Sequence, residues 1–170
     1  IMMSKHNEQA FEAYIESVMN VGWTTVVNTT FDPTHDLFPE ELISFLSQSQ
    51  PTLWAELEKL NGTLLPEQIV KALVKERLSK GTLHILRHGF KFHGKTLKLA
   101  YYRPAHTLSK EAEALYQCNT FQVCRQVFYH PDKNQSIDMV LAINGIPVAT
   151  LELKNPGTGQ NVKHAIQQYR

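Results

Sequence analysis

Residues 136–154 read Ser-Ile-Asp-Met-Val-Leu-Ala-Ile, Asn-Gly-Ile-Pro, Val-Ala-Thr-Leu-Glu-Leu-Lys, and this stretch decides the fold. Its first and last parts are rich in β-branched and aliphatic residues, which predicts strands at 136–143 and 147–154. Asn144-Gly145 between them is the usual sequence of a tight hairpin turn. The stretch therefore predicts an antiparallel β-hairpin, and the register of its strands determines which side chains share a face.

Two loop lengths are compatible with this turn, and they place the side chains differently. A two-residue loop sets Asp138 opposite Leu151 and mixes apolar with charged side chains on both faces. A three-residue loop, or an equivalent bulge, sets Asp138 opposite Glu152 and leaves the other face entirely apolar. Because burial selects a clean apolar face, we predict the three-residue register. The apolar face then consists of Ile137, Met139, Leu141, Ile143, Ala149, Leu151 and Leu153.

In this register Asp138, Glu152 and Lys154 share one face. A hard cation such as Mg²⁺ takes one or two carboxylates together with waters and substrate phosphate, and the backbone carbonyl of Leu153 would add a ligand. A bound metal lowers the pKa of water and offsets charge on phosphoryl oxygens, while Lys154 would orient or deprotonate that water. The pattern favours phosphodiester hydrolysis, and its alternative is an exposed Glu–Lys pair on an ordinary strand.

These segments, followed by Thr-Gly-Gln-Asn-Val-Lys-His-Ala-Ile-Gln-Gln-Tyr-Arg at 158–170, resemble the N-terminal nuclease domain of type I restriction enzyme R (restriction) subunits. That domain belongs to the PD-(D/E)XK nuclease superfamily. The resemblance is strongest over 120–170 and extends to Leu-Arg-His-Gly-Phe-Lys at 86–91 and Asn-Glu-Gln-Ala-Phe-Glu at 7–12. It implies a restriction-endonuclease-like three-layer α/β fold, with a mixed central sheet flanked by helices, and a single nuclease domain over 1–170.

The resemblance also implies roles for the hairpin residues. Asp138 becomes the motif aspartate, Glu152 the second acid and Lys154 the motif lysine, with Mg²⁺ or Mn²⁺ held by Asp138, Glu152 and Leu153. The implied reaction is hydrolysis of phosphodiester bonds in duplex DNA by metal-activated water, which leaves 5′-phosphate and 3′-hydroxyl ends. The alternative is a catalytically silent nuclease-fold module for DNA binding or subunit docking.

Two further site residues are expected from the resemblance. A glutamate on the first helix often completes the site in these nucleases, and Glu8 and Glu12 lie on one helix face because they are four residues apart; we favour Glu12. Many relatives carry Gln-x-x-x-Tyr on the helix after the lysine strand, whereas Gln167, Gln168 and Tyr169 are adjacent here. Gln168 is our candidate for a polar contact near the site.

The ends of the sequence, Ile1 before Met2-Met3 and Arg170 within an expected helix, lead us to expect a piece of a longer polypeptide. The resemblance implies that the missing part holds an ATP-driven DNA translocase motor, so ATP is expected to act there and not to bind here. It further implies double-stranded DNA as a partner, and methyltransferase and specificity subunits that dock onto the full-length chain.

The length, charge and cysteine content of the chain limit what can be expected of its core, its DNA binding and its location. A chain of 170 residues can bury one substantial core, but its net charge of +1 gives no global attraction to DNA. Local basic clusters would have to supply DNA contacts, namely Lys71, Lys75, Arg77 and Lys80, or Arg87, His88, Lys91, His93, Lys95 and Lys98. Two cysteines, no signal peptide and no apolar run of membrane length lead us to expect a reduced cytoplasmic protein with no membrane partner.

Periodicity predicts the remaining elements. Helices are expected at 7–20, 39–47, 51–60, 66–79 and 107–115, and further strands at 23–28, 97–102 and 121–129. Helices thus dominate the first half and strands the second, which predicts a mixed sheet flanked by helices.

Overall fold

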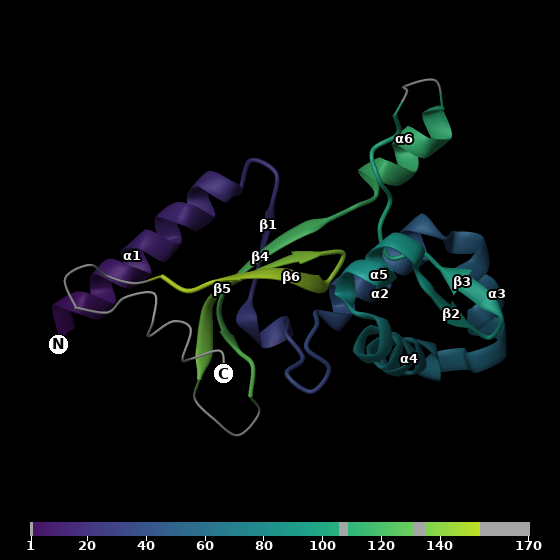
Figure 1. The fold of residues 1–170 in the computed structure, drawn as a ribbon, viewed down its shortest axis with the longest axis horizontal. Coiled ribbons are helices and arrows are strands. Elements are labelled where there is room, and N and C mark those ends of the chain that lie inside the picture. Colours follow the sequence, from purple (N-terminus) through teal and green to yellow (C-terminus); the bar gives the residue numbers. More distant parts are fainter. Residues whose placement is uncertain (1, 106–108, 131–134, 154–170) are drawn as a thin grey trace.

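The computed structural model describes residues 2–105, 109–130 and 135–153, and Figure 1 shows how their helices and strands are arranged. A four-stranded sheet forms one half of the molecule, and a helical part with a separate two-stranded sheet forms the other. This is a mixed α/β fold, so the predicted class is confirmed, and the arrangement is consistent with a three-layer nuclease-like fold.

The main sheet is mixed, as predicted. Its strand order is β1-β4-β5-β6, with β1 (Thr24–Val26) parallel to β4 (Phe121–Phe128). The hairpin strands β5 (Ser136–Ile143) and β6 (Ile146–Leu151) continue the sheet in antiparallel fashion. The long helix α1 (Met2–Met19) lies beside the sheet, at the end remote from the helical part (Figure 1).

The helical part contains four helices and a small hairpin. Two of its helices begin with proline, whose fixed φ and missing N–H suit the first helical position. The elements of this part are α2 (Pro39–Ser49), α3 (Pro51–Asn61), α4 (Leu65–Lys80), α5 (Thr82–His88), β2 (Phe90–Phe92) and β3 (Lys95–Leu97). Short 3-10 turns lie at η1 (Asn28–Thr30) and η2 (Gly62–Leu64).

Helix α6 (Lys110–Gln117) precedes β4 in the chain. Its N-cap is Ser109, whose hydroxyl oxygen accepts a hydrogen bond from the amide of Ala112, 3.2 Å away. A serine in this position satisfies one of the backbone amides that the first turn of a helix leaves without an intrahelical partner. The helix was expected at 107–115 and is confirmed with later bounds.

Two apolar clusters form the core. The helical cluster consists of buried leucine, isoleucine, valine and phenylalanine side chains, nearly all from the helical part. The sheet cluster joins Phe38 to side chains of β4 and β5, among them Val140 and Ala142. Ile146, the first residue of β6, belongs to the helical cluster. The hairpin is therefore packed into both clusters, which fixes its position relative to the rest of the fold.

The turn of the hairpin is held tightly against the helical part. Asn144 and Gly145 have φ values of +51° and +81°, the combination that a type I′ hairpin turn requires. The Gly145 carbonyl accepts a hydrogen bond of 2.9 Å from the amide of Phe38. A Cβ atom on Gly145 would lie 2.5 Å from the Phe38 carbonyl oxygen and 2.6 Å from the Leu42 nitrogen. Glycine is therefore needed at this position both for its φ and for its lack of a side chain.

The register of the hairpin combines the two possibilities that the sequence leaves open. Next to the turn, Ile143 pairs with Ile146, as in a two-residue loop. Farther from the turn the register shifts between Ala142 and Leu141, and Met139 pairs with Leu151. This is the register of the three-residue loop, reached through a β-bulge on β6. The predicted bulged alternative is confirmed, although β6 ends at Leu151 and not at residue 154.

The observed burial of the hairpin differs from the expectation that only its apolar face is buried. Met139 is fully buried on that face, but Ala149 is exposed. Val140 and Ala142, on the face assigned to Asp138, are also buried in the sheet cluster. The expectation of one buried face is wrong, because the segment around Phe38 covers the second face in this part of the hairpin.

Two local predictions in the middle of the chain are wrong. Residues 98–102 are not a strand, since β3 ends at Leu97. Helix α5 and strand β2, which together span 82–92, were not expected. Helix α5 is bounded by Gly81 and Gly89, both with positive φ, and its seven residues are too few for a helical period to be recognised in the sequence.

Candidate active site

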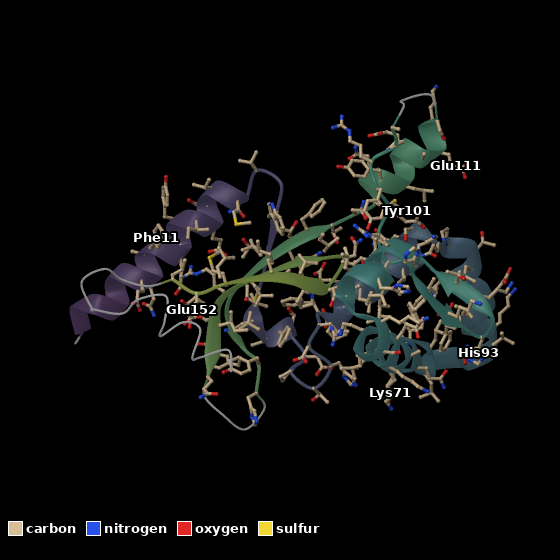
Figure 2. The ribbon with its side chains drawn as sticks, in the orientation of Figure 1. Phe11, Lys71, His93, Tyr101, Glu111 and Glu152 are labelled. Carbon is tan, nitrogen blue, oxygen red and sulfur yellow. The ribbon has the colours of Figure 1, made fainter. Side chains whose placement is uncertain are left out.

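The hairpin sets Asp138 and Glu152 across from each other. Asp138 is half-buried on β5, and its Oδ2 atom accepts a hydrogen bond of 2.7 Å from the backbone amide of Leu153. Because Met139 pairs with Leu151, the next position outward sets Glu152 across from Asp138. Directly opposed residues of antiparallel strands have Cβ atoms about 5 Å apart. Figure 2 shows Glu152 just beyond β6, at the end of the strand close to α1.

The contact between Asp138 and Leu153 extends the hairpin beyond its last ladder pair. The carboxylate of Asp138 replaces a backbone carbonyl as the acceptor for the Leu153 amide. A hydrogen bond from an amide to a carboxylate fixes the orientation of the carboxylate. The backbone on both sides of this amide, at Glu152 and Leu153, is thereby held next to the Asp138 side chain.

The described oxygen donors, two carboxylates and a backbone carbonyl, are of the kind that could hold a hard cation. Glu152 is half-buried, with its Oε2 atom shielded from solvent, and Asp138 is half-buried as well, so both acids are partly desolvated. A carboxylate offers about four lone-pair positions, so acceptance of one amide does not exhaust Asp138. Among the described residues, no three His, Cys, Asp or Glu side chains form a metal-binding group. Two carboxylates with nearby backbone oxygen fit Mg²⁺, which completes its shell with water, better than Zn²⁺.

Glu12 lies on α1 and reaches β4. It is 1 % exposed, and its two carboxylate oxygens accept hydrogen bonds from Arg125 Nε at 3.2 Å and from Gln126 Nε2 at 2.7 Å. Glu16, one turn further along α1, accepts a bond of 3.1 Å from Arg125 Nη1. Glu12 therefore connects the helix to the sheet, and its proposed part in the site stays a prediction. Glu8, the other candidate on this helix, is half-buried.

Gln126 links Glu12 to the strand that carries Asp138. Its Oε1 atom accepts a hydrogen bond of 2.9 Å from the hydroxyl of Ser136, and its position on β4 falls opposite Asp138, between the pairs on either side. Its φ is +51°, a conformation that non-glycine residues adopt rarely. Sequence reasoning did not single out Arg125, Gln126 or Ser136. Only the register of β4 against β5 brings them to the site, and no local motif signals it.

Two predicted site residues, Lys154 and Gln168, lie outside the residues that the structure describes. The described part of the candidate site thus consists of Asp138, Glu152 and Leu153, and Glu12 of α1 is bound to β4 through Arg125 and Gln126.

The basic side chains predicted as DNA contacts lie in the helical part, and several have local partners. Lys71 pairs with Glu67, Lys80 with Glu76 at 2.6 Å, and Lys95 with Glu56 at 3.0 Å. Arg77 donates to the backbone carbonyl oxygens of His35 and Asp36. Half-buried Arg77 therefore fixes a loop, whereas Arg87, His88, Lys91, His93 and Lys98 are exposed.

Comparison with known proteins identifies a family for the chain. A family model described as "Type I restriction enzyme R protein N terminus" matches residues 5–170. No curated protein matches the chain, and no solved structure does either. Within the described residues, no helix is long and apolar enough to cross a membrane.

Proposed function

Since the chain belongs to the family of type I restriction enzyme R protein N termini, we propose that it is a Mg²⁺-dependent endonuclease domain acting on duplex DNA. The observation that carries this proposal is the hydrogen bond of 2.7 Å between the Leu153 amide and Asp138 Oδ2. Together with the bulged register, this bond holds Asp138 and Glu152 side by side in a partly buried place. An ordinary exposed Glu–Lys pair on a strand would not require such an arrangement.

The roles of the residues follow from their chemistry. Asp138 and Glu152 would bind the metal, and the Leu153 carbonyl would add an oxygen ligand of the kind that Mg²⁺ takes. The bound metal supplies Lewis-acid stabilisation of the scissile phosphate and an acidified water. The Leu153 amide orients the Asp138 carboxylate, which preorganises the site before a metal binds. Lys154 would accept a proton from the attacking water or stabilise negative charge on the phosphate.

The proposed substrate and partners are those of a type I restriction complex. The domain would cut duplex DNA without recognising a sequence, while other subunits supply methylation and site recognition. The net charge of +1 is compatible with this division of labour, because a domain with little global charge depends on local contacts and on other parts of the complex for DNA affinity. Gln168 and Glu12 stay candidates for further polar contacts in the site.

The test uses the full-length R protein assembled in its complex, with plasmid cleavage and ATP hydrolysis measured on the same preparations. Asp138→Asn and Glu152→Gln remove one charge each and keep the side-chain shape, and the side-chain carbonyl that Asp138→Asn introduces can still accept the Leu153 amide. We expect each substitution, and Lys154→Ala, to lower cleavage by about 100-fold or more, with ATP hydrolysis unchanged. Calorimetry with Mn²⁺ should show weaker metal binding for the two acid variants.

The matched control is Glu58→Gln, which neutralises an exposed carboxylate on α3 and should cleave like the wild type. Wild-type cleavage by all three site variants would assign these residues to structure and leave the catalytically silent module as the better reading.

A further inference from the structure

Positive charge is concentrated in one segment of the chain. Residues 71–98 contain eight of the 17 lysines and arginines, but only one of the 16 aspartates and glutamates, Glu76. Because the whole chain has a net charge of only +1, the remaining residues together are net negative. Any attraction that this chain exerts on a polyanion must therefore come mainly from this segment.

The fold gathers part of this segment around a pocket. The pocket lies where the end of α4, helix α5 and the β2–β3 hairpin meet, and its volume is about 370 Å³. Its polar lining includes Lys80, His84, His88, Lys91 and Thr96. We call this set of five residues the basic pocket. Its contributors come from separate elements, so it exists only in the folded chain.

Two residues that line the pocket, Gly89 and Phe90, are held by close packing. Gly89, between α5 and β2, has a φ of +72°, and a Cβ atom there would lie 2.2 Å from the Leu97 carbonyl oxygen. Phe90, the next residue, is 2 % exposed and packs into the helical cluster. This close approach locks α5 against the small hairpin. On the same helix the imidazoles of His84 and His88, one turn apart, have ring centroids 4.6 Å apart.

The charge of the pocket is only partly compensated. The acidic residue in its described lining, Glu76, is paired with Lys80 at 2.6 Å. In the part of the chain that the structure describes, neither Lys91 nor Arg87, which precedes His88 on α5, forms an ion pair within 4.0 Å. The side chains of His84, His88 and Thr96 add hydrogen-bond donors, and a neutral imidazole still carries one N–H. The basic pocket thus presents converging donors with an excess of positive charge.

We propose that the basic pocket binds a phosphate group of the DNA backbone, and that Arg87, which precedes His88 on α5, contacts a neighbouring phosphate. Converging lysine, imidazole and hydroxyl donors suit the several oxygens of a phosphate. A planar carboxylate of an acidic protein is matched best by the paired N–H groups of arginine, and the described residues that line the pocket include no arginine. Backbone phosphate contacts position a protein on DNA without reading its sequence.

This inference rests on the proposed function and extends it, because it adds a second DNA contact to the cleavage site. Figure 2 shows Lys71 and His93 in the helical part and Glu152 at the opposite end of the molecule. A duplex held at the basic pocket would therefore be anchored away from the bond that is cut. The anchor would give a domain of low net charge its own affinity for DNA.

The test measures the affinity of the full-length R protein for a fluorescein-labelled 30-base-pair duplex by anisotropy, in EDTA and over a range of salt concentrations. The variants are Arg87→Gln with Lys91→Gln, and His84→Gln with His88→Gln. Each lost phosphate contact should reduce the slope of log K against log salt by about 0.9. We expect the Arg87/Lys91 double variant to bind more weakly, with a slope shallower by about 1 to 2. The histidine double variant should bind more weakly at every salt concentration.

The charge-matched control is Lys59→Gln with Lys110→Gln, two exposed lysines outside the segment, which should keep the wild-type slope. Binding curves of both pocket variants that coincide with the wild type would overturn the proposal. If a polyglutamate peptide then bound the wild type but not the Arg87/Lys91 variant, the pocket would belong to an acidic protein partner. Asp138→Asn separates the two proposals, because full cleavage by that variant would reject the nuclease site and leave the DNA-binding result standing.

Discussion

The carboxylate of Glu12 on α1 and the guanidinium of Arg125 on β4 form an ion pair, with 3.2 Å between Oε2 and Nε. Burial alone would lower the pKa of Arg125, but hydrogen bonds and charges from Glu16 and Glu12 outweigh it, and the pKa is raised. Arg125 is therefore held as a cation between two carboxylates. This cluster fastens α1 to the sheet at the helix position where a site glutamate was expected.

Arg125→Met should destabilise the chain strongly. The substitution keeps much of the side-chain volume but leaves the buried Glu12 carboxylate without its cation. Removal of one partner of a buried pair costs about 3 kcal/mol at the low end of the measured range. We expect the free energy of unfolding in urea to fall by about this amount. An unchanged free energy would mean that α1 contributes little to the stability of the sheet.

Glu12→Gln distinguishes a structural role for Glu12 from a catalytic one. Glutamine can still accept a hydrogen bond from Gln126 or Arg125, so the loss of stability should be smaller than for Arg125→Met. If Glu12 only fastens the helix, cleavage by the assembled complex should change in proportion to stability. A large loss of cleavage at unchanged stability, measured beside the same substitution at Glu16, would instead assign Glu12 to the site.

Gly145→Ala should unfold the hairpin turn. The residue needs a φ of +81°, and the new Cβ would lie 2.5 Å from the Phe38 carbonyl oxygen. Gly94→Ala is the matched control, because its φ is +74° but nothing lies within 4 Å of the Cβ. The control should cost only the strain of the left-handed backbone, about 1–2 kcal/mol. Gly145→Ala should cost clearly more in thermal or urea unfolding, and equal losses would show that the contact with Phe38 is not tight.

The hairpin shows how far the sequence could predict the candidate site. Alternation of apolar and polar residues selected the register that sets Asp138 across from Glu152, while Asn144-Gly145 demanded a two-residue turn. Both requirements are met because one extra residue on β6 is accommodated as a bulge between them. The alternation of apolar and polar residues predicts the register of a strand, and the turn residues predict the length of the loop. Neither locates the bulge that reconciles the two.

The wrongly predicted strand at 97–102 has a different cause. Its alternating residues Leu97 and Leu99 are both fully buried, as in a strand. The N–H and carbonyl groups of its backbone, however, form hydrogen bonds with side-chain amides instead of with a neighbouring strand. Gln50 bonds both the N–H and the carbonyl of Lys98, each at 2.9 Å, and Asn119 does the same for Tyr101 at 3.0 and 2.6 Å. Amide side chains from distant positions thus replace a neighbouring strand, and no local pattern predicts this.

Asp32 should make stability depend on pH in the acid range. Its Oδ2 lies 2.6 Å from His35 Nδ1, and its Oδ1 accepts from the Thr34 amide at 2.8 Å. Burial acts to raise the pKa of Asp32, but the hydrogen bonds from His35 and Thr34 and the charge of His35 together lower it. A carboxyl whose pKa is lowered by folding stabilises the fold above its ordinary pKa of about 3.9, and this stabilisation is lost as pH falls through the lowered value.

Asp32→Asn should therefore flatten the acid side of the stability profile below about pH 4, where the wild type loses this contribution. The measurement is the unfolding midpoint in urea between pH 6 and the acid limit of folding, with Glu58→Gln as the exposed control. A profile for Asp32→Asn that is parallel to the wild type throughout would exclude a stabilising role for ionised Asp32.

Cys124 should resist alkylation as long as the sheet is folded. It is fully buried in the sheet cluster, and burial together with the charge of Glu16 raises its pKa to about 12. The thiolate is the reactive form of cysteine, so at pH 8 the folded chain holds Cys124 as an unreactive thiol. Cys118, on the rim of the helical cluster, is only half-buried. Iodoacetamide at pH 8 followed by peptide mass spectrometry should modify Cys118 first, and Cys124 only after urea is added.

The same alkylation assay connects Cys124 to the ion pairs that fasten α1. Arg125 is the next residue on β4, and it holds the helix through Glu12 and Glu16. Arg125→Met, which loosens α1 from this strand, should increase the rate at which Cys124 is alkylated. The rate at Cys118 should stay close to that of the wild type. Equal rates of alkylation at Cys124 and Cys118 in the wild type would contradict the burial of Cys124 in the sheet cluster.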